Sequence, residues 1–304
     1  MKNKLQKRES LLGYLFLIPS LIAFAVFMFY PMADTIYLSF FDWNLVKPTK
    51  TFVGLSNYVR LFTDPNTLKI LKNTMLYIVI LLVLNLIIPY VLSFILSVII
   101  KKGKGFYKAV FFLPSVISLV VGSILYTWIL NPVSGPVAII AKRLGLTMPI
   151  WSQTEGWVIV VLCLITSWKA FGYNFIVILA GVSGVSQDVI EAARLDGVPI
   201  FKIFRDMVLP MSSATGIYVL IYTIVQGLQF VYTPIKVITQ GGPNYASSNL
   251  IYKSYHEAFT LYQTGMSSAT SVLTVVIFMV LLVLEFKFVE KGVYYENSVS
   301  YTHL

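Results

Sequence analysis

Long apolar runs alternate with shorter polar stretches along the chain. A helix rises about 1.5 Å per residue, so about 20 apolar residues cross a hydrocarbon core about 30 Å thick. On this criterion six membrane spans are predicted, near residues 11–31, 74–100, 108–130, 157–181, 211–238 and 268–289. We therefore expect an all-α, multi-pass membrane protein with six transmembrane helices.

The spans divide the chain into three predicted parts. Residues 1–73 hold an N-terminal tail, the first span and an external loop; residues 74–289 hold the other five helices, and residues 290–304 form a C-terminal tail. The first apolar run follows a basic leader, as in a signal peptide. No small-residue cleavage site follows, and the run is long enough to span, so we expect a retained helix.

Composition supports membrane insertion. Of the 304 residues, 57% are hydrophobic and 12% charged, against about 45–50% and about 25% in soluble domains. The net charge of +10 is compatible with nucleic acid or anionic substrates, but basic cytoplasmic loops supply the same excess. We favour the loops and expect no nucleic-acid partner. The single cysteine, Cys163, lies inside a span and excludes a disulfide framework.

Lys and Arg divide unequally between the two sides of the membrane. One side has Lys2, Lys4, Lys7, Arg8, Lys101, Lys102, Lys104, Lys108, Arg194, Lys202, Arg205, Lys287 and Lys291. The other has Lys47, Lys50, Arg60, Lys69, Lys72, Lys142, Arg143 and Lys253, spread over longer segments. The positive-inside bias predicts that both termini and the 182–210 segment are cytoplasmic.

Motifs for catalysis are absent from the sequence. "KKGKGFYK" has Gly and Lys without the spacing of a phosphate-binding loop, and neither a His-Glu-x-x-His nor a Gly-x-Ser-x-Gly motif occurs. The only histidines, His256 and His303, have no ligand partners nearby in sequence. We expect no catalytic residue, no metal site and no cofactor bound by this chain.

The segment "DVIEAARLDGVPIFKIFRDMVLP", residues 188–210, is charged and capable of forming helices. Asp188 and Glu191 have capping-box spacing and predict a helix start. Gly197 permits a bend, and Pro199 suits the first turn of a second helix. The segment is therefore predicted to be a helix, a turn and a helix.

The second of these helices is amphipathic. Apolar residues recur at three- and four-residue spacing: Ile200, Ile203, Phe204 and Met207. On the first helix, Ala192 and Ala193 are small enough for close approach of another surface. Such a pair can dock into a partner's groove, lie on the membrane interface or pack beneath its own spans, and the pattern leaves these alternatives open.

The order Glu191-Ala192-Ala193, Asp196-Gly197 and Leu209-Pro210 resembles the EAA loop of permease subunits of binding-protein-dependent ABC importers. The chain is similar to their carbohydrate-uptake group, on the side of the maltose and glycerol-phosphate permeases, in four further stretches. These are "YLFLIPSLIAFAVFMFYPMADTIYLSFFDWN", "FVGLSNYVRLFTDP", "FFLPSVISLVVGSILYTWILNP" and "TQGGPNYASSNLIYKSYHEAF". One departure is "VSQDVIEAA", where such permeases often carry a proline ahead of the Glu.

The resemblance implies a type I importer fold in a bacterial cytoplasmic membrane. It implies a second homologous permease, two cytoplasmic ATPase subunits that bind ATP and Mg, and an extracytoplasmic solute-binding protein. It also implies that the EAA loop is a coupling helix seated in the ATPase. The positions carried over are Glu191, Ala192, Ala193, Asp196 and Gly197, and Glu191 retains its alternative role as a helix cap.

Polar residues inside the spans indicate a solute path. Tyr218, Tyr222, Gln226 and Gln229 share one face of the fifth span, at i, i+4, i+8 and i+11. Tyrosine offers a ring face and a hydroxyl, and glutamine offers donors and acceptors, so the face suits a sugar. The fourth span adds Trp168, Tyr173 and Asn174. The alternative is that these groups join neighbouring helices.

Other polar span residues are assigned structural roles. Lys169 shares a face with Tyr173 and would suit an anionic solute, but we favour a local partner. In the sixth span we expect Ser267, Ser268, Thr270 and Ser271 to permit close helix packing.

The main functional prediction is a sugar or oligosaccharide permease. Three alternatives remain: an ABC permease for glycerol phosphate or an acidic oligosaccharide, an ion-coupled secondary transporter, and a non-transporting scaffold. The secondary transporter is disfavoured because the spans hold essentially no acidic residue before Glu285.

Overall fold

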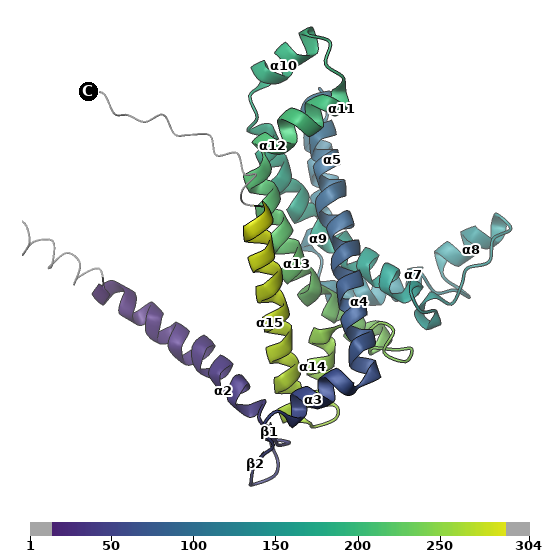
Figure 1. The fold of residues 1–304 in the computed structure, drawn as a ribbon. Coiled ribbons are helices and arrows are strands. Elements are labelled where there is room, and N and C mark those ends of the chain that lie inside the picture. Colours follow the sequence, from purple (N-terminus) through teal and green to yellow (C-terminus); the bar gives the residue numbers. More distant parts are fainter. Residues whose placement is uncertain (1–13, 290–304) are drawn as a thin grey trace, which may run out of the picture. The chain divides into compact units, whose positions relative to one another are not determined.

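The computed structural model describes residues 14–289, which are mostly helical (Figure 1). Five helices in this range are long and apolar enough to span a membrane: Tyr14–Leu38, Pro65–Ile99, Trp157–Ser183, Ser213–Thr239 and Thr264–Lys287. A bent pair, Lys104–Val116 with Leu119–Ile129, brings the possible total to six. The predicted all-α class is confirmed.

The third predicted span, 108–130, is not a continuous helix, and this expectation is corrected. Its segments are α6 (Lys104–Phe112), the 3₁₀ turn η4 (Leu113–Val116) and α7 (Leu119–Ile129), and the bend measures 99°. Lys169 donates from Nζ to the carbonyl oxygens of Ser115 (2.9 Å) and Ile117 (2.6 Å). These bonds satisfy carbonyl groups that the interrupted helix leaves free.

The described residues form two compact units. The first contains the described residues up to Asp64 together with Ser254–Val275, and the second contains Pro65–Lys253 together with the described residues from Val276. Two helices, α14 (Leu250–Phe259) and α15 (Thr264–Val289), contribute residues to both.

The first unit begins with the span Tyr14–Leu38, which includes a π-helical turn, η1 (Ala25–Phe29), and α2 (Tyr30–Leu38). A short antiparallel hairpin follows, β1 (Phe41–Asp42) with β2 (Thr51–Phe52), and then α3 (Ser56–Thr63). Asn57 donates from Nδ2 to the carbonyl oxygens of Ser39 (2.9 Å) and Phe41 (3.0 Å). This bonding ties the hairpin to α3.

Helices α14 and α15 pack closely in the first unit through small hydroxyl side chains. The Oγ atom of Ser254 lies 3.1 Å from that of Ser267 and 2.5 Å from that of Ser271. Thr270 donates to the carboxylate of the buried Glu257 at 2.5 Å. These contacts agree with the helix-packing role expected for the sixth-span serines and threonine.

The second unit holds the remaining elements. They run α4 (Pro65–Leu82), η2 (Val83–Ile87), α5 (Ile88–Phe94), η3 (Ile95–Ile99), α6, η4, α7, α8 (Pro136–Arg143), η5 (Trp151–Gln153), α9 (Trp157–Ser183), α10 (Gln187–Leu195), α11 (Ile200–Lys202), η6 (Ile203–Val208), α12 (Leu209–Met211), α13 (Ser213–Pro234) and η7 (Ile235–Thr239). Helix α9 is central, because it packs against α4, α5, α6, η4 and α13. Its buried face includes Phe175, Ile178 and Val182.

Candidate functional site

A helical hairpin connects α9 to α13 and is called here the 187–211 hairpin. Its first helix, α10, begins after Ser186, and no side-chain hydrogen bond caps it. Asp188 is the second residue of the helix, so the prediction that Asp188 caps it is wrong. Ser186 already takes the extended conformation of the N-cap, which places Asp188 in the first turn, where a carboxylate complements the helix dipole.

The predicted bend of this hairpin is confirmed at Gly197. The Gly197 amide donates to the carbonyl of Arg194 (3.1 Å), and the Val198 amide donates to that of Ala193 (3.0 Å). This pair of bonds is a Schellman motif, which needs a left-handed residue, and Gly197 has φ +72°. Pro199 then precedes α11, which begins at Ile200.

The apolar stripe of the second helix faces the chain's own spans. Ile203 is fully buried, and the Phe204 ring lies 4.9 Å from that of Phe94. Ile200 is 43% exposed and lies outside this packing. Ala193, on the first helix, is buried in the same cluster. The stripe is therefore an internal contact of this chain.

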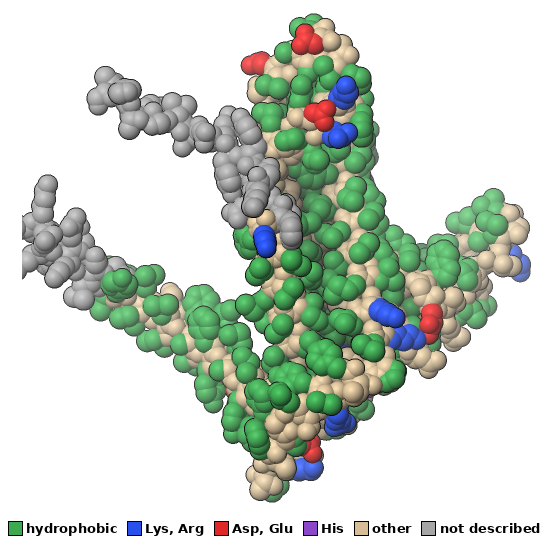
Figure 2. Space-filling model, viewed as in Figure 1, with side chains coloured by type: hydrophobic (Ala, Val, Ile, Leu, Met, Phe, Trp, Pro, Cys, Tyr) green, Lys and Arg blue, Asp and Glu red, His purple; other side chains and the backbone are tan. Residues whose placement is uncertain are grey.

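The exposed tip of the hairpin consists of the other predicted coupling positions and one further residue. Glu191, Ala192, Asp196 and Gly197 are exposed. Leu195 is 89% exposed, and sequence reasoning missed it. Figure 2 shows acidic and basic side chains gathered over α10 and α11, whereas hydrophobic side chains cover most of the visible face of the spans. The tip is thus a charged surface around one exposed leucine.

Three tyrosines from α9 and α13 form a cluster. The hydroxyl oxygens of Tyr173 and Tyr218 lie 2.8 Å apart. The Tyr222 ring centroid lies 4.9 Å from that of Tyr173 and 6.1 Å from that of Tyr218, onto which it stacks. Tyr173 and Tyr218 are exposed in the chain, and Tyr222 is half-buried. This tyrosine cluster brings ring faces and hydroxyls together on one surface.

The other predicted path residues are placed differently. Gln229 is exposed and Gln226 half-buried, further along α13. Trp168 packs edge-on against Tyr126 of α7, at 5.3 Å between ring centroids. Asn174 is buried and donates to the carbonyl oxygen of Asn85 (2.8 Å). The structure therefore groups Tyr173 with the face of α13 and places Trp168 and Asn174 in contacts between helices.

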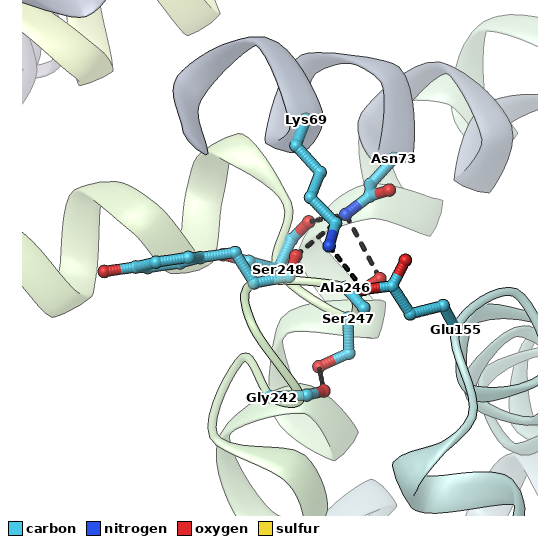
Figure 3. A network of polar contacts seen from close by, with 8 residues as sticks. Lys69, Asn73, Glu155, Gly242, Ala246, Ser247 and Ser248 are labelled. Carbon is cyan, nitrogen blue, oxygen red and sulfur yellow. Dashed lines mark hydrogen bonds and ion pairs between the residues drawn. The ribbon is translucent and has the colours of Figure 1, made fainter. Parts of the chain in front are cut away.

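A second polar network, which sequence reasoning missed, fixes the loop after η7 (Figure 3). Asn73 of α4 donates to the carbonyl oxygens of Tyr245, Ala246 and Ser248 at 2.9–3.3 Å. Tyr77, one turn later, donates to that of Ser247 (2.8 Å). The i, i+4 spacing of Asn73 and Tyr77 was the available signal.

An ion pair joins the start of α4 to the loop before α9. Lys69 lies 2.5 Å from the Glu155 carboxylate, beside the Asn73 contacts (Figure 3). Among residues 14–289, no group of three or more His, Cys, Asp or Glu could hold a metal ion. The polar groups of this region serve to hold the loop.

A protein-family model described as "Binding-protein-dependent transport system inner membrane component" matches residues 101–291. This match contains the 187–211 hairpin and the tyrosine cluster and covers more than half of the chain. The chain belongs to this family of ABC importer permeases.

Two relatives match the permease over nearly its whole length. The probable ABC transporter permease protein YurN of Bacillus subtilis (strain 168) is 31% identical, over 94% of this chain and 98% of the relative. The sn-glycerol-3-phosphate transport system permease protein UgpA of Agrobacterium fabrum is 29% identical, over 94% and 97%. The expected family resemblance is confirmed.

A solved structure shares the fold of the permease. A chain of a bacterial ABC transporter involved in the import of the acidic polysaccharide alginate matches with a TM-score of 0.80 at 20% identity. The match covers 96% of this chain and 99% of that one.

Proposed function

We propose that this permease forms half of the translocation path of an ATP-driven importer for a sugar or oligosaccharide. The other half is a second homologous permease, and two cytoplasmic ATPase subunits bind and hydrolyse ATP. An extracytoplasmic solute-binding protein delivers the solute. Both termini and the 187–211 hairpin lie on the cytoplasmic side, as the distribution of Lys and Arg favours.

The exposed tip of the hairpin supports coupling to an ATPase. The stripe through Ile203 and Phe204 holds the hairpin against its own spans, so its tip is left for a partner. Leu195 offers an exposed apolar anchor, and Glu191 and Asp196 flank it with charge. Exposed apolar side chains with a polar rim are typical of interface anchors. In this proposal, movement of the ATPase reaches α9 and α13 through the hairpin.

The tyrosine cluster is the main evidence for the chemical class of the solute. A sugar presents C–H faces and hydroxyl groups, which match an exposed ring face and phenolic hydroxyls at Tyr173 and Tyr218. Lys169 donates to two backbone carbonyls and so has a structural partner. A neutral sugar therefore fits better than glycerol phosphate or an acidic oligosaccharide, even though relatives include a glycerol-phosphate permease and an alginate importer.

The experiment is a solute panel on the reconstituted complex. The permease is co-purified with its associated subunits in lipid, and ATP hydrolysis is measured with solute-binding protein and each candidate solute. A neutral sugar or oligosaccharide should stimulate hydrolysis. Stimulation only by glycerol phosphate or an acidic oligosaccharide would overturn the solute class, and a permease that purifies without ATPase subunits would overturn the coupling.

A further inference from the structure

The segment between α7 and α9 contains an apolar, basic lobe, defined here as the 131–150 arm. It begins two residues after α7 ends at Ile129 and finishes shortly before α9 begins at Trp157. In Figure 1 the arm, with α8, extends away from the helices of its own unit. The arm therefore connects α7, the second half of the bent pair, to the start of the span α9, whose other end leads into the 187–211 hairpin.

Exposed tryptophans on either side of the arm indicate its depth in the membrane. Trp128 is 61% exposed and Trp157 is 56% exposed, and they flank the arm in the sequence. Exposed tryptophans at span ends are typical of the membrane–water interface. Trp151 is buried and donates from Nε1 to the carbonyl oxygen of Leu130 (2.7 Å), which fastens the arm to the end of α7. The exposed tryptophans therefore favour a position of the arm at the membrane–water interface.

The arm exposes more apolar surface than a loop in water needs. The aliphatic side chains exposed on it are Val133, Val137, Ile139, Ile140, Leu144, Leu146 and Ile150. A pocket of about 730 Å³ lies beside Val133, Ile139 and Leu146, and Lys142, Arg143 and Thr147 are the polar residues of its lining. An exposed apolar patch with basic residues beside it fits the acyl–headgroup boundary of a bilayer.

The basic residues of the arm have no acidic neighbours in the sequence. No Asp or Glu occurs between residues 101 and 154 of the sequence. The next acidic residue, Glu155, is engaged with Lys69. A phospholipid would satisfy both features of the arm. Its phosphate would supply the missing negative charge at Lys142 and Arg143, and its two acyl chains would cover the aliphatic surface.

We propose that the 131–150 arm binds an anionic phospholipid at the membrane interface. The phosphate lies at Lys142 and Arg143, and the acyl chains lie along Ile139 and Leu146. The inference depends on membrane insertion and not on the transported solute, so it stands or falls separately from the sugar assignment.

The first test measures contact between the arm and lipid in the complete complex in nanodiscs. An environment-sensitive fluorophore is attached at Ile140→Cys in a Cys163→Ala background, and phospholipids carrying a doxyl quencher are added. We expect quenching at Ile140 and little at Val46→Cys, a control that is also highly exposed but lies in the loop between β1 and β2. An unquenched Ile140 label would overturn the proposal. If its emission then shifted on addition of solute-binding protein, the arm would be a protein-docking surface.

The second test measures headgroup selectivity. Phosphatidylglycerol retained by the complex is counted by native mass spectrometry after exchange into detergent with phosphatidylcholine. Lys142→Gln should lower retention several-fold, whereas Lys47→Gln, which removes the same charge from another exposed loop, should not. Equal retention in the two variants would contradict the assignment of the phosphate to the arm.

Discussion

Arg194 of α10 donates a hydrogen bond of 2.8 Å from Nη2 to the backbone carbonyl oxygen of Val98, at the end of the helix Pro65–Ile99. The last carbonyls of a helix lack partners within the helix, and a cation there also complements the helix dipole. One side chain therefore caps the second span and holds the 187–211 hairpin to it.

Replacing Arg194 should weaken both the cap of the second span and the attachment of the 187–211 hairpin to it. Arg194→Gln removes a charged hydrogen bond, which contributes about 1.5–3 kcal/mol, and should lower both the thermal stability of the complex and solute-stimulated ATP hydrolysis. Arg205→Gln is the matched control, because Arg205 is exposed and forms an ion pair with its neighbour Asp206, at 3.6 Å. Equal effects of the two variants would show that the contact with Val98 is unimportant.

Gly197 should be needed for its backbone conformation. Its φ is +72°, and no described atom lies within 4 Å of the position that a Cβ would take. Gly197→Val should therefore destabilise the turn by about 1–2 kcal/mol and reduce coupling, whereas Gly197→Asn should retain most of it, because Asn tolerates the left-handed region. Stability is measured by thermal unfolding and coupling by stimulated ATP hydrolysis.

The two Gly197 variants also test docking. If Gly197→Asn unfolds like the unmodified complex yet fails to couple, a partner surface approaches the glycine closely. If Gly197→Val couples normally, the turn is not part of the coupling path. Gly105→Ala serves as control, since that glycine also has open space around it and no positive φ.

The tyrosine cluster should affect solute handling more than assembly. Tyr218→Phe removes one hydroxyl, and the loss of a hydrogen bond of about 0.5–1.5 kcal/mol should raise the KM for uptake by about two- to tenfold. Tyr222→Ala, which removes a ring, should have a larger effect. Leu164→Ala is the control, because Leu164 is an exposed α9 residue on the face opposite to Tyr173. Unchanged uptake with both tyrosine variants would remove the cluster from the path.

Lys169 should act through the bend of the third span. Lys169→Met leaves the carbonyl oxygens of Ser115 and Ile117 without their donor, so the complex should lose on the order of 2–4 kcal/mol of stability. Lys169→Arg should retain most of it. The KM for the solute should not change in Lys169→Arg. A selective rise in the KM, with thermal stability unchanged in Lys169→Met, would assign Lys169 to the solute instead.

Hydropathy located the spans because an apolar run of sufficient length has few other stable forms in a membrane. It missed the bend in the third span, since the apolar run continues on both sides of Pro114 and Ser115, and the contacts that satisfy the freed carbonyl groups come from Lys169 of another helix. It also began the second span nine residues late. The first turns of α4 carry Lys69, which pairs with Glu155 in the loop before α9, and Asn73, which bonds the loop at 245–248.

The residue types of the candidate site could be predicted from the sequence, but the positions and contacts of their side chains were harder to predict. Helical spacing placed Tyr218 and Tyr222 on one face, and this follows from backbone geometry alone. Helical spacing could not decide whether the stripe through Phe204 packs against the chain's own spans or docks on a partner, because both arrangements use the same spacing. In the structure Phe204 packs against the rings of Phe94 and Tyr90, so the stripe faces inward. Burial of Asn174 depends on Asn85 from another helix, which no local pattern reveals.

We expect this permease to move solute only when partner subunits couple it to ATP hydrolysis. The direct measurement is uptake of labelled solute by proteoliposomes that contain either the complete complex or this chain alone, with solute-binding protein outside and ATP inside. We predict ATP-dependent accumulation with the complete complex and none with the chain alone. Accumulation by the chain alone, without ATP, would show that transport does not need the ATPase subunits.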